Sequence, residues 1–246
     1  MAASATLPPP PALADLSARP IAVFLDFDGT LVEIAERPED IAVPASLATT
    51  LGDIADRLEG RLALVSGRGI ENLERHCGPL AIACAGSHGL DLRAADGTPL
   101  GAPATALEPG VVAELRSFAA DHGVDFEHKP HGAALHSRRA PEKEQACAIF
   151  VADVAAREGL GVKHGKRVCE LVPLGASTGA AVRALMAEPN FAGATPVFVG
   201  DDVTDEDGFA ACAALGGFGV AVGPRQSENA RYALADPAAV QQWLAG

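Results

Sequence analysis

Short, mostly apolar runs alternate with helix-like segments along much of the 246-residue chain. Four such runs end at a polar residue or a glycine, namely residues 21–25, 61–65, 80–85 and 197–199. Runs of this kind are typical of buried strands in a parallel sheet. Residues 45–58 carry apolar side chains at helical spacing. The alternation of strand and helix predicts an α/β fold, in which helices wrap a parallel sheet.

The pattern changes in the middle of the chain, where residues 109–120 predict an amphipathic helix followed by a hairpin at 124–137. A second helix is predicted at about 141–157 and an extended segment at 168–172. This order indicates a small α+β unit inserted into the α/β core. We expect a flexible Pro-rich lead at 1–20, a core formed by 21–101 and 172–246, and an inserted unit at 102–171.

Composition narrows the classes of function. The net charge is −13, from 19 basic and 32 acidic residues, which argues against nucleic acid or an anionic membrane as a partner. The 5 cysteines are scattered without a CxxC pair, as in reduced cytoplasmic proteins. The chain start lacks the features of a signal peptide, and no stretch approaches the length of a membrane span. We expect a cytoplasmic protein, in which an anionic substrate would need local positive charge or a metal.

Carboxylates gather where two predicted strands end. Asp26 and Asp28 follow the first strand in the motif DFDGT, and Asp201 and Asp205 follow the run 197–199 in the motif GDDVTDED. Ligands of open α/β sheets bind at the carboxyl ends of the strands. Carboxylates this close repel one another unless a cation holds them, and Mg2+ is the usual cation for oxygen ligands. The two motifs therefore predict a magnesium site.

The same residues suit phosphoryl transfer. Asp26 is placed to attack phosphorus and form an aspartyl-phosphate, and Asp28 could protonate the leaving oxygen. Ser66-Gly67 ends a further strand, where a hydroxyl and a helix N-terminus could hold phosphate oxygens. Simpler interpretations stay open at this point: DFDGT as an Asx-type turn, the acid-rich motif as a helix start, and Ser-Gly as an ordinary turn. Zinc-type His/Cys spacing and a GxxxxGK[ST] loop are both absent from the sequence.

Taken together, DFDGT, SGR and GDDVTDE resemble the haloacid-dehalogenase (HAD) superfamily of phosphatases. Further segments along nearly the whole chain are similar to trehalose-6-phosphate phosphatases: PPPAL, AGSHGL, EHKP, ALHSRRAP and HGKRVCELVP. The resemblance implies a HAD-like core with an α+β cap. It also implies the hydrolysis of trehalose 6-phosphate to trehalose and phosphate in trehalose biosynthesis, with a functional link to a trehalose-phosphate synthase.

The resemblance also implies roles for individual residues. Asp26 would be the nucleophile and Asp28 the general acid and base. Ser66 would bind the phosphoryl group, and Thr30, which can offer a hydroxyl and its amide, and Gly67 are further predicted phosphate-binding residues. The implied Mg2+ ligands are Asp26, the Asp28 carbonyl and Asp201, with Asp205 supporting them. The implied sugar-binding residues are Glu127, Lys129, Arg138 and Glu170. His88 and Lys166 lie in matching segments, and we interpret them as a loop histidine and a solvated lysine.

One position departs from the family. At the start of the helix after the insert, where the family places a lysine, this chain has Thr178. A cation at about 4 Å contributes roughly 4 kcal/mol at an effective dielectric near 20, and its full loss would slow the reaction about a thousandfold. The candidates to replace it, together with Mg2+, are Lys163, Lys166 and, least favourably placed, Arg183. If none does, Thr178→Lys would raise turnover.

Two alternatives to trehalose 6-phosphate hydrolysis follow. The first is a HAD phosphatase acting on another glycosyl phosphate, because the cap would decide the sugar. The second is a catalytically weakened sugar-phosphate sensor, because Thr178 replaces the expected lysine. A phosphate-release assay separates an enzyme from a sensor.

Overall fold

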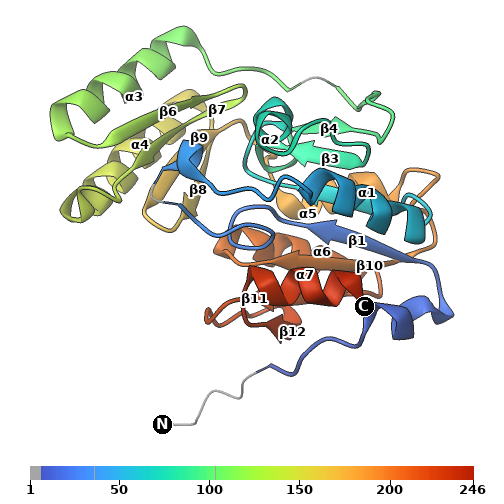
Figure 1. Ribbon diagram of the computed structural model, residues 1–246. Coiled ribbons are helices and arrows are strands. Elements are labelled where there is room, and N and C mark those ends of the chain that lie inside the picture. The colour runs from blue at the N-terminus through green and yellow to red at the C-terminus, as the bar shows by residue number, and fades with distance from the viewer. Residues whose placement is uncertain (1–6, 36, 103) are drawn as a thin grey trace.

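The computed structural model describes residues 7–35, 37–102 and 104–246. They form a core built on one large sheet and a smaller unit built on a second sheet (Figure 1). We call the smaller unit the cap. Its helices and strands lie beside one end of the core, so that a face of the cap sheet is turned toward the core.

The core sheet has eight strands in the order β12-β11-β10-β1-β2-β3-β4-β5. Neighbours from β12 to β3 run parallel, and β4 and β5 add an antiparallel edge. Every residue of the central strand β1 is buried, as expected for a strand covered on both faces. The bounds are β1 Ile21–Leu25, β2 Leu62–Val65, β3 Ala83–Gly86, β4 Asp91–Arg93, β5 Pro99–Leu100, β10 Thr195–Gly200, β11 Phe218–Val222 and β12 Ala230–Leu234.

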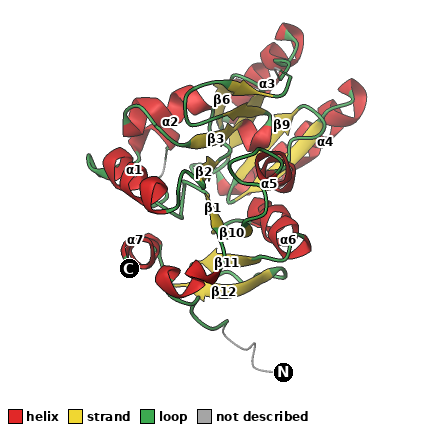
Figure 2. Cartoon of the chain, turned by 90° about the vertical axis from the view of Figure 1, so that its right-hand side faces the viewer, coloured by secondary structure: helices red, strands yellow, loops and turns green. Residues whose placement is uncertain are grey.

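Helices cover both faces of this sheet (Figure 2). Because alternate strand residues point to opposite faces, Val23 and Leu25 pack with α1, α2 and α7, whereas Ala22 and Phe24 pack with α5 and α6. The helix bounds are α1 Leu47–Arg57, α2 Ile70–Cys77, α5 Thr178–Met186, α6 Glu206–Ala214 and α7 Pro237–Ala245. Short 3-10 helices of the core are η1 Leu13–Ala18, η2 Pro38–Asp40, η3 Ser87–Gly89 and η5 Val203–Asp205.

The cap sheet is antiparallel, in the order β6-β7-β9-β8. Its elements are α3 Pro109–His122, β6 Asp125–Lys129, β7 Gly132–His136, η4 Pro141–Lys143, α4 Glu144–Glu158, β8 Gly161–Gly165 and β9 Val168–Val172. Leu135 and Leu171 join the apolar cluster under α3 and α4. The intervening residues His136 and Glu170 point the other way, into the cleft described below.

The N-terminal lead is packed against the core over the part that the structure describes. Ala233 N donates to the Pro8 carbonyl at 3.0 Å, and Trp243 Nε1 donates to the Pro11 carbonyl at 2.8 Å. The described part of the lead is therefore hydrogen-bonded to the core, whereas the sequence predicts a flexible segment. Residues 1–6 of the predicted flexible lead lie outside the described residues.

Several elements go beyond what the sequence pattern predicts. The edge strands β8 and β12, the hairpin β4–β5 and the terminal helix α7 were not expected. Edge strands are half-exposed and carry mixed polar and apolar residues, so they give no continuous apolar run. Among the residues described, no helix combines the length and apolar character needed to cross a membrane.

Candidate active site

The turn that follows β1 brings the two acid motifs together. Asp26 N donates to the carbonyl of Val199 at 2.9 Å, so Asp26 lies where β1 and β10 end. Gly29 has a φ of 81°, in the left-handed region that glycine tolerates. A Cβ on Gly29 would lie 2.2 Å from Asp201 Oδ2. Glycine at this position therefore permits the close approach of the first motif to the second.

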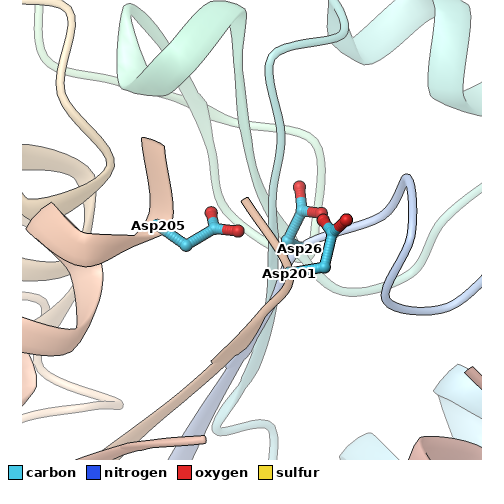
Figure 3. A group of neighbouring side chains, drawn as sticks. All are labelled: Asp26, Asp201 and Asp205. Carbon is cyan, nitrogen blue, oxygen red and sulfur yellow. The ribbon is translucent and has the colours of Figure 1, made fainter. Parts of the chain in front are cut away.

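Three carboxylates form a cluster at this sheet edge, from Asp26, Asp201 and Asp205 (Figure 3). One oxygen from each lies within 4.8 Å of the others. Asp205 is oriented by the start of η5, because the Asp202 amide donates to Asp205 Oδ2 at 2.9 Å. Three carboxylates without nitrogen or sulfur donors are a set that suits a hard divalent cation.

The electrostatics of this cluster also favour a cation. Burial raises the pKa of Asp26 well above its usual value, and Asp205 and Asp201 raise it further. Burial is likewise the main cause that raises the pKa of Asp205, and that raises the pKa of Asp201 to about 7. Each group thus resists ionisation next to the others. A divalent cation would relieve this repulsion, so the residues fit the magnesium site that the sequence predicts.

The carboxylate of Asp28 is directed elsewhere. It pairs with Arg68 in a two-point contact, in which Nε lies 2.6 Å from Oδ2 and Nη2 lies 2.7 Å from Oδ1. Arg68 Nη1 also donates to Asn72 Oδ1 at 2.9 Å, which fixes the guanidinium plane. Asp28 therefore stays outside the three-carboxylate cluster. Sequence reasoning missed Arg68 as a partner of Asp28, although it is part of the SGR motif.

The predicted phosphate loop follows β2. Ser66 is buried, its amide donates to the Ala85 carbonyl at 2.8 Å, and its Oγ accepts from the Arg68 amide at 3.2 Å. Ser66 and Gly67 line the cleft described below. The hydroxyl of Thr30 is fully buried without a hydrogen-bond partner among the described residues, and Thr30 does not line the cleft. Ser66 and Gly67 thus line the same cleft as Asp26 and Asp201, whereas Thr30 does not.

The four predicted sugar-binding residues all face the core. Glu127 and Lys129 lie on β6, Glu170 lies on β9, and Arg138 follows β7. Lys129 Nζ donates to Glu170 Oε2 and, at 3.4 Å, to the Gly67 carbonyl. Further contacts are His136 Nε2 to Glu127 Oε2 at 2.8 Å and Arg138 Nη1 to the Ala35 carbonyl. The cap is therefore hydrogen-bonded to the core next to Gly67.

His88 also belongs to this contact region, as a loop histidine whose ring has a partner in the cap. Its Nε2 lies 3.2 Å from Glu170 Oε2, and a Cβ on Gly67 would lie 2.6 Å from its ring. Burial would raise the pKa of Glu170, but Lys129 and His88 outweigh it and lower this pKa to about 2. Glu170 is thus held as a carboxylate. The resemblance of the AGSHGL segment was the signal that could have identified His88.

A cleft of about 950 Å³ separates the two units and collects these side chains. It is lined by Asp26, Asp28, Ser66, Gly67, Asp201, Glu127, Lys129, Arg138 and Glu170. Of the basic residues proposed to replace a lysine at Thr178, Lys163 and Lys166 line it as well. Arg183 is exposed on α5 and does not line the cleft, and Thr178 itself is only 4% exposed.

Comparison with known proteins identifies the family. The family model described as Trehalose-phosphatase matches residues 24–238. The chain is 36% identical over 233 residues to the trehalose-6-phosphate phosphatase of Escherichia coli, an alignment that covers 94% of this chain and 87% of the relative.

Solved structures show the same fold. The C-terminal domain of trehalose-6-phosphate phosphatase from C. albicans superposes with a TM-score of 0.84 at 23% identity, covering 98% of both chains. A phosphatase of the haloalkanoate (HAD) superfamily from Bacteroides thetaiotaomicron gives a TM-score of 0.59 at 13% identity, covering 93% and 94%. The predicted HAD-like α/β core with a separate cap is confirmed.

Proposed function

The chain belongs to the trehalose-phosphatase family of phosphoric monoester hydrolases, and we propose that it hydrolyses trehalose 6-phosphate in a Mg2+-dependent reaction through an aspartyl-phosphate. One observation carries the proposal: Asp26 and Asp201 of the carboxylate cluster and the four polar cap residues line the same cleft. A phosphate at one end and a disaccharide at the other would be recognised together there.

The cluster supplies the residues for a metal. The carboxylates of Asp26, Asp201 and Asp205 and the carbonyl of Asp28 would hold Mg2+. When bound, this ion neutralises charge on the phosphoryl oxygens and on the nucleophile. Without such a charge, burial and the neighbouring aspartates raise the pKa of Asp26 and so disfavour the carboxylate form that acts as the nucleophile.

The protein groups divide the chemistry between them. An oxygen of Asp26 attacks phosphorus, the bond from phosphorus to the sugar oxygen breaks, and Asp28 gives that oxygen a proton. In the second step water attacks the aspartyl-phosphate, Asp28 takes the proton from water, and phosphate leaves with Asp26 restored. The two-point contact from Arg68 holds the carboxyl group of Asp28 in one orientation, and both steps use this group.

The cap supports recognition of the sugar. Hydrogen bonds in which one partner is charged are the stronger ones, so Glu127, Lys129, Arg138 and Glu170 suit a ligand rich in hydroxyls. Their enclosure in the cleft would also exclude bulk water from the reacting groups. Ser66 and Gly67, next to Lys129, would hold the phosphoryl oxygens.

The test is phosphate release by the purified protein from a panel of sugar phosphates, with Mg2+ and with excess chelator. We expect trehalose 6-phosphate to give the highest kcat/KM, and chelator to stop the reaction until Mg2+ is restored. A better substrate among other glycosyl phosphates would change the substrate assignment. Hydrolysis at an undiminished rate in chelator would contradict the metal assignment, and no hydrolysis of any monoester would favour the sensor.

A further inference from the structure

Three cations that line the cleft, Arg68, Lys129 and Arg225, have a close anionic partner. Arg68 is paired in two points with Asp28, and Lys129 is paired with the buried Glu170. Arg225 Nη2 lies 2.7 Å from Glu206 Oε1, and Arg225 also donates to the carbonyls of Asp201 and Asp202. The carboxylate partners neutralise much of the charge of these three cations. None of the three therefore offers an unpaired positive charge to a phosphoryl group.

Lys163, on the cap strand β8, is different. Its Nζ lies 3.5 Å from Asp207 Oδ2, the longest ion pair between residues that the structure describes. Asp207 is 53% exposed, whereas the side chain of Lys163 is only 19% exposed. Ion pairs with an exposed partner contribute little to stability, so Lys163 can exchange Asp207 for another anion at small cost.

The position of Asp207 brings Lys163 to the start of α5. Ser177 Oγ donates to Asp207 Oδ2 at 3.3 Å, and Ser177 is the N-cap residue of α5. A Cβ on Gly179 would lie 2.4 Å from the carbonyl oxygen of Asp207, so α5 and α6 touch here. Lys163 therefore reaches, from the cap, the helix end that carries Thr178.

The same strand lies over the acid motif. A Cβ on Gly165 would lie 2.9 Å from Asp202 Oδ2, one residue from Asp201 of the carboxylate cluster. Lys163 pairs in register with Glu170, and cross-strand partners point to the same face of a sheet. That face is the one that lines the cleft. Lys166, by contrast, is exposed in the turn between β8 and β9.

We propose that Lys163 supplies, from the cap, the positive charge that stabilises the phosphoryl group while Asp26 attacks it. The inference rests on the proposed phosphatase function, and it assigns to a cap residue the charge that Thr178 does not provide. A fixed cation beside developing charge is worth most where water is excluded. Because β8 belongs to the cap, this charge is present at the reacting group only while the cap lies against the core.

The test compares Lys163→Met, which removes the charge, with Lys163→Arg, which keeps it, and with Lys143→Met as a matched cap control outside the cleft. We expect Lys163→Met to lower kcat for trehalose 6-phosphate about tenfold to hundredfold, with KM changed less than about threefold. Lys163→Arg should stay within about fivefold of the wild type, since the charge is retained. Lys143→Met should match the wild type, and all three should keep its Tm.

Thr178→Lys tests the same role in a second way, because it places a cation of the core at the helix end that Lys163 reaches from the cap. In the wild-type background we expect little change in kcat. In the Lys163→Met background we expect Thr178→Lys to recover at least about threefold of the lost rate. A structural role for Lys163 would give no such recovery.

An aryl phosphate and inorganic phosphate separate this inference from the proposed substrate. The loss in Lys163→Met should be the same on the aryl phosphate, and the affinity for inorganic phosphate with Mg2+, measured by calorimetry, should fall as well. If the wild type hydrolyses the aryl ester but not trehalose 6-phosphate, the substrate assignment fails and Lys163 is judged on the aryl ester. The role of Lys163 would be overturned if Lys163→Met left kcat unchanged or changed only the KM for the sugar phosphate. If the protein has no hydrolase activity, an unchanged affinity for phosphate would overturn it.

Discussion

Carboxylates of the core and of the cap lie around one cleft, but their pKa values are shifted in opposite directions. In the core, burial and mutual repulsion raise the pKa values of Asp26, Asp201 and Asp205. In the cap, the neighbouring Lys129 and the hydrogen bonds from histidines outweigh burial and lower the pKa values of Glu127 and Glu170. The three core carboxylates thus need an added cation to balance their charge, whereas Glu127 and Glu170 of the cap have Lys129 beside them.

This difference suggests a division of labour. A set of unpaired acids is costly to keep ionised, and such clusters are typical of functional sites. A paired set is already satisfied and rigid, so it can present hydroxyl-binding groups in fixed positions. Substitutions in the core should therefore affect the chemistry on every substrate, and substitutions in the cap should affect the choice of sugar.

Asp26→Asn should have the largest effect. The amide is a far poorer nucleophile and a weaker metal ligand, so we expect kcat to fall at least about a thousandfold on trehalose 6-phosphate and on an aryl phosphate alike. Steady-state kinetics and circular dichroism would check activity and fold together. More than a few per cent of residual activity would contradict covalent catalysis by Asp26.

Asp28→Asn should be almost as severe on sugar phosphates but milder on aryl phosphates. The sugar oxygen needs a proton to leave, whereas an aryl oxygen is already a good leaving group. We expect about a hundredfold or greater loss of kcat on trehalose 6-phosphate and a smaller loss in the initial burst with the aryl ester. Equal burst losses on both substrates would argue against the acid role.

Lys129→Ala and Glu127→Ala test the cap. Each removes a charged partner for sugar hydroxyls, so kcat/KM for trehalose 6-phosphate should fall about tenfold to hundredfold, with a much smaller fall for a small aryl phosphate. Lys143→Ala, in the cap but outside the cleft, is the matched control. A uniform loss on both substrates would show that these charges position the cap as a whole.

The comparison also shows how far sequence reasoning extends. Asp26 and Asp201 could be predicted to meet because each follows a buried strand, and the carboxyl ends of parallel strands share one edge. The contacts of Arg68 and His88 could not, because they depend on which loops face each other across 40 and 82 residues of chain. The strand β8 was missed because the short stretch of residues 161–165 begins and ends with glycine and carries Lys163 and His164, without the clean alternation of a core strand.

The smallest expected effects are on stability rather than on turnover, and the first of them is that of Asp201→Asn on the stability of the metal-free protein. Its pKa is raised from a usual value near 3.8 to about 7, so the folded state binds the proton more tightly than the unfolded state between these pH values. The free energy of unfolding of the wild type should therefore fall as pH rises from about 4 to 7, and this loss should be smaller in Asp201→Asn. In excess chelator at pH 8 we expect the variant to be more stable by about 1 kcal/mol, with the gap closing at pH 4.

Glu127→Gln should change the free energy of unfolding at pH 8 in the opposite direction. Although burial favours the neutral form, His136 and Lys129 lower the pKa of Glu127, so its ionised form stabilises the folded state above its usual pKa, and that stability is lost as pH falls. At pH 8 this variant should therefore be less stable than the wild type, by up to about 1 kcal/mol because the side chain is partly exposed. Denaturant unfolding at pH 4 and 8, with chelator and with Mg2+, would measure both variants. If both substitutions shifted stability in the same direction at pH 8, the electrostatic contrast between core and cap would be wrong.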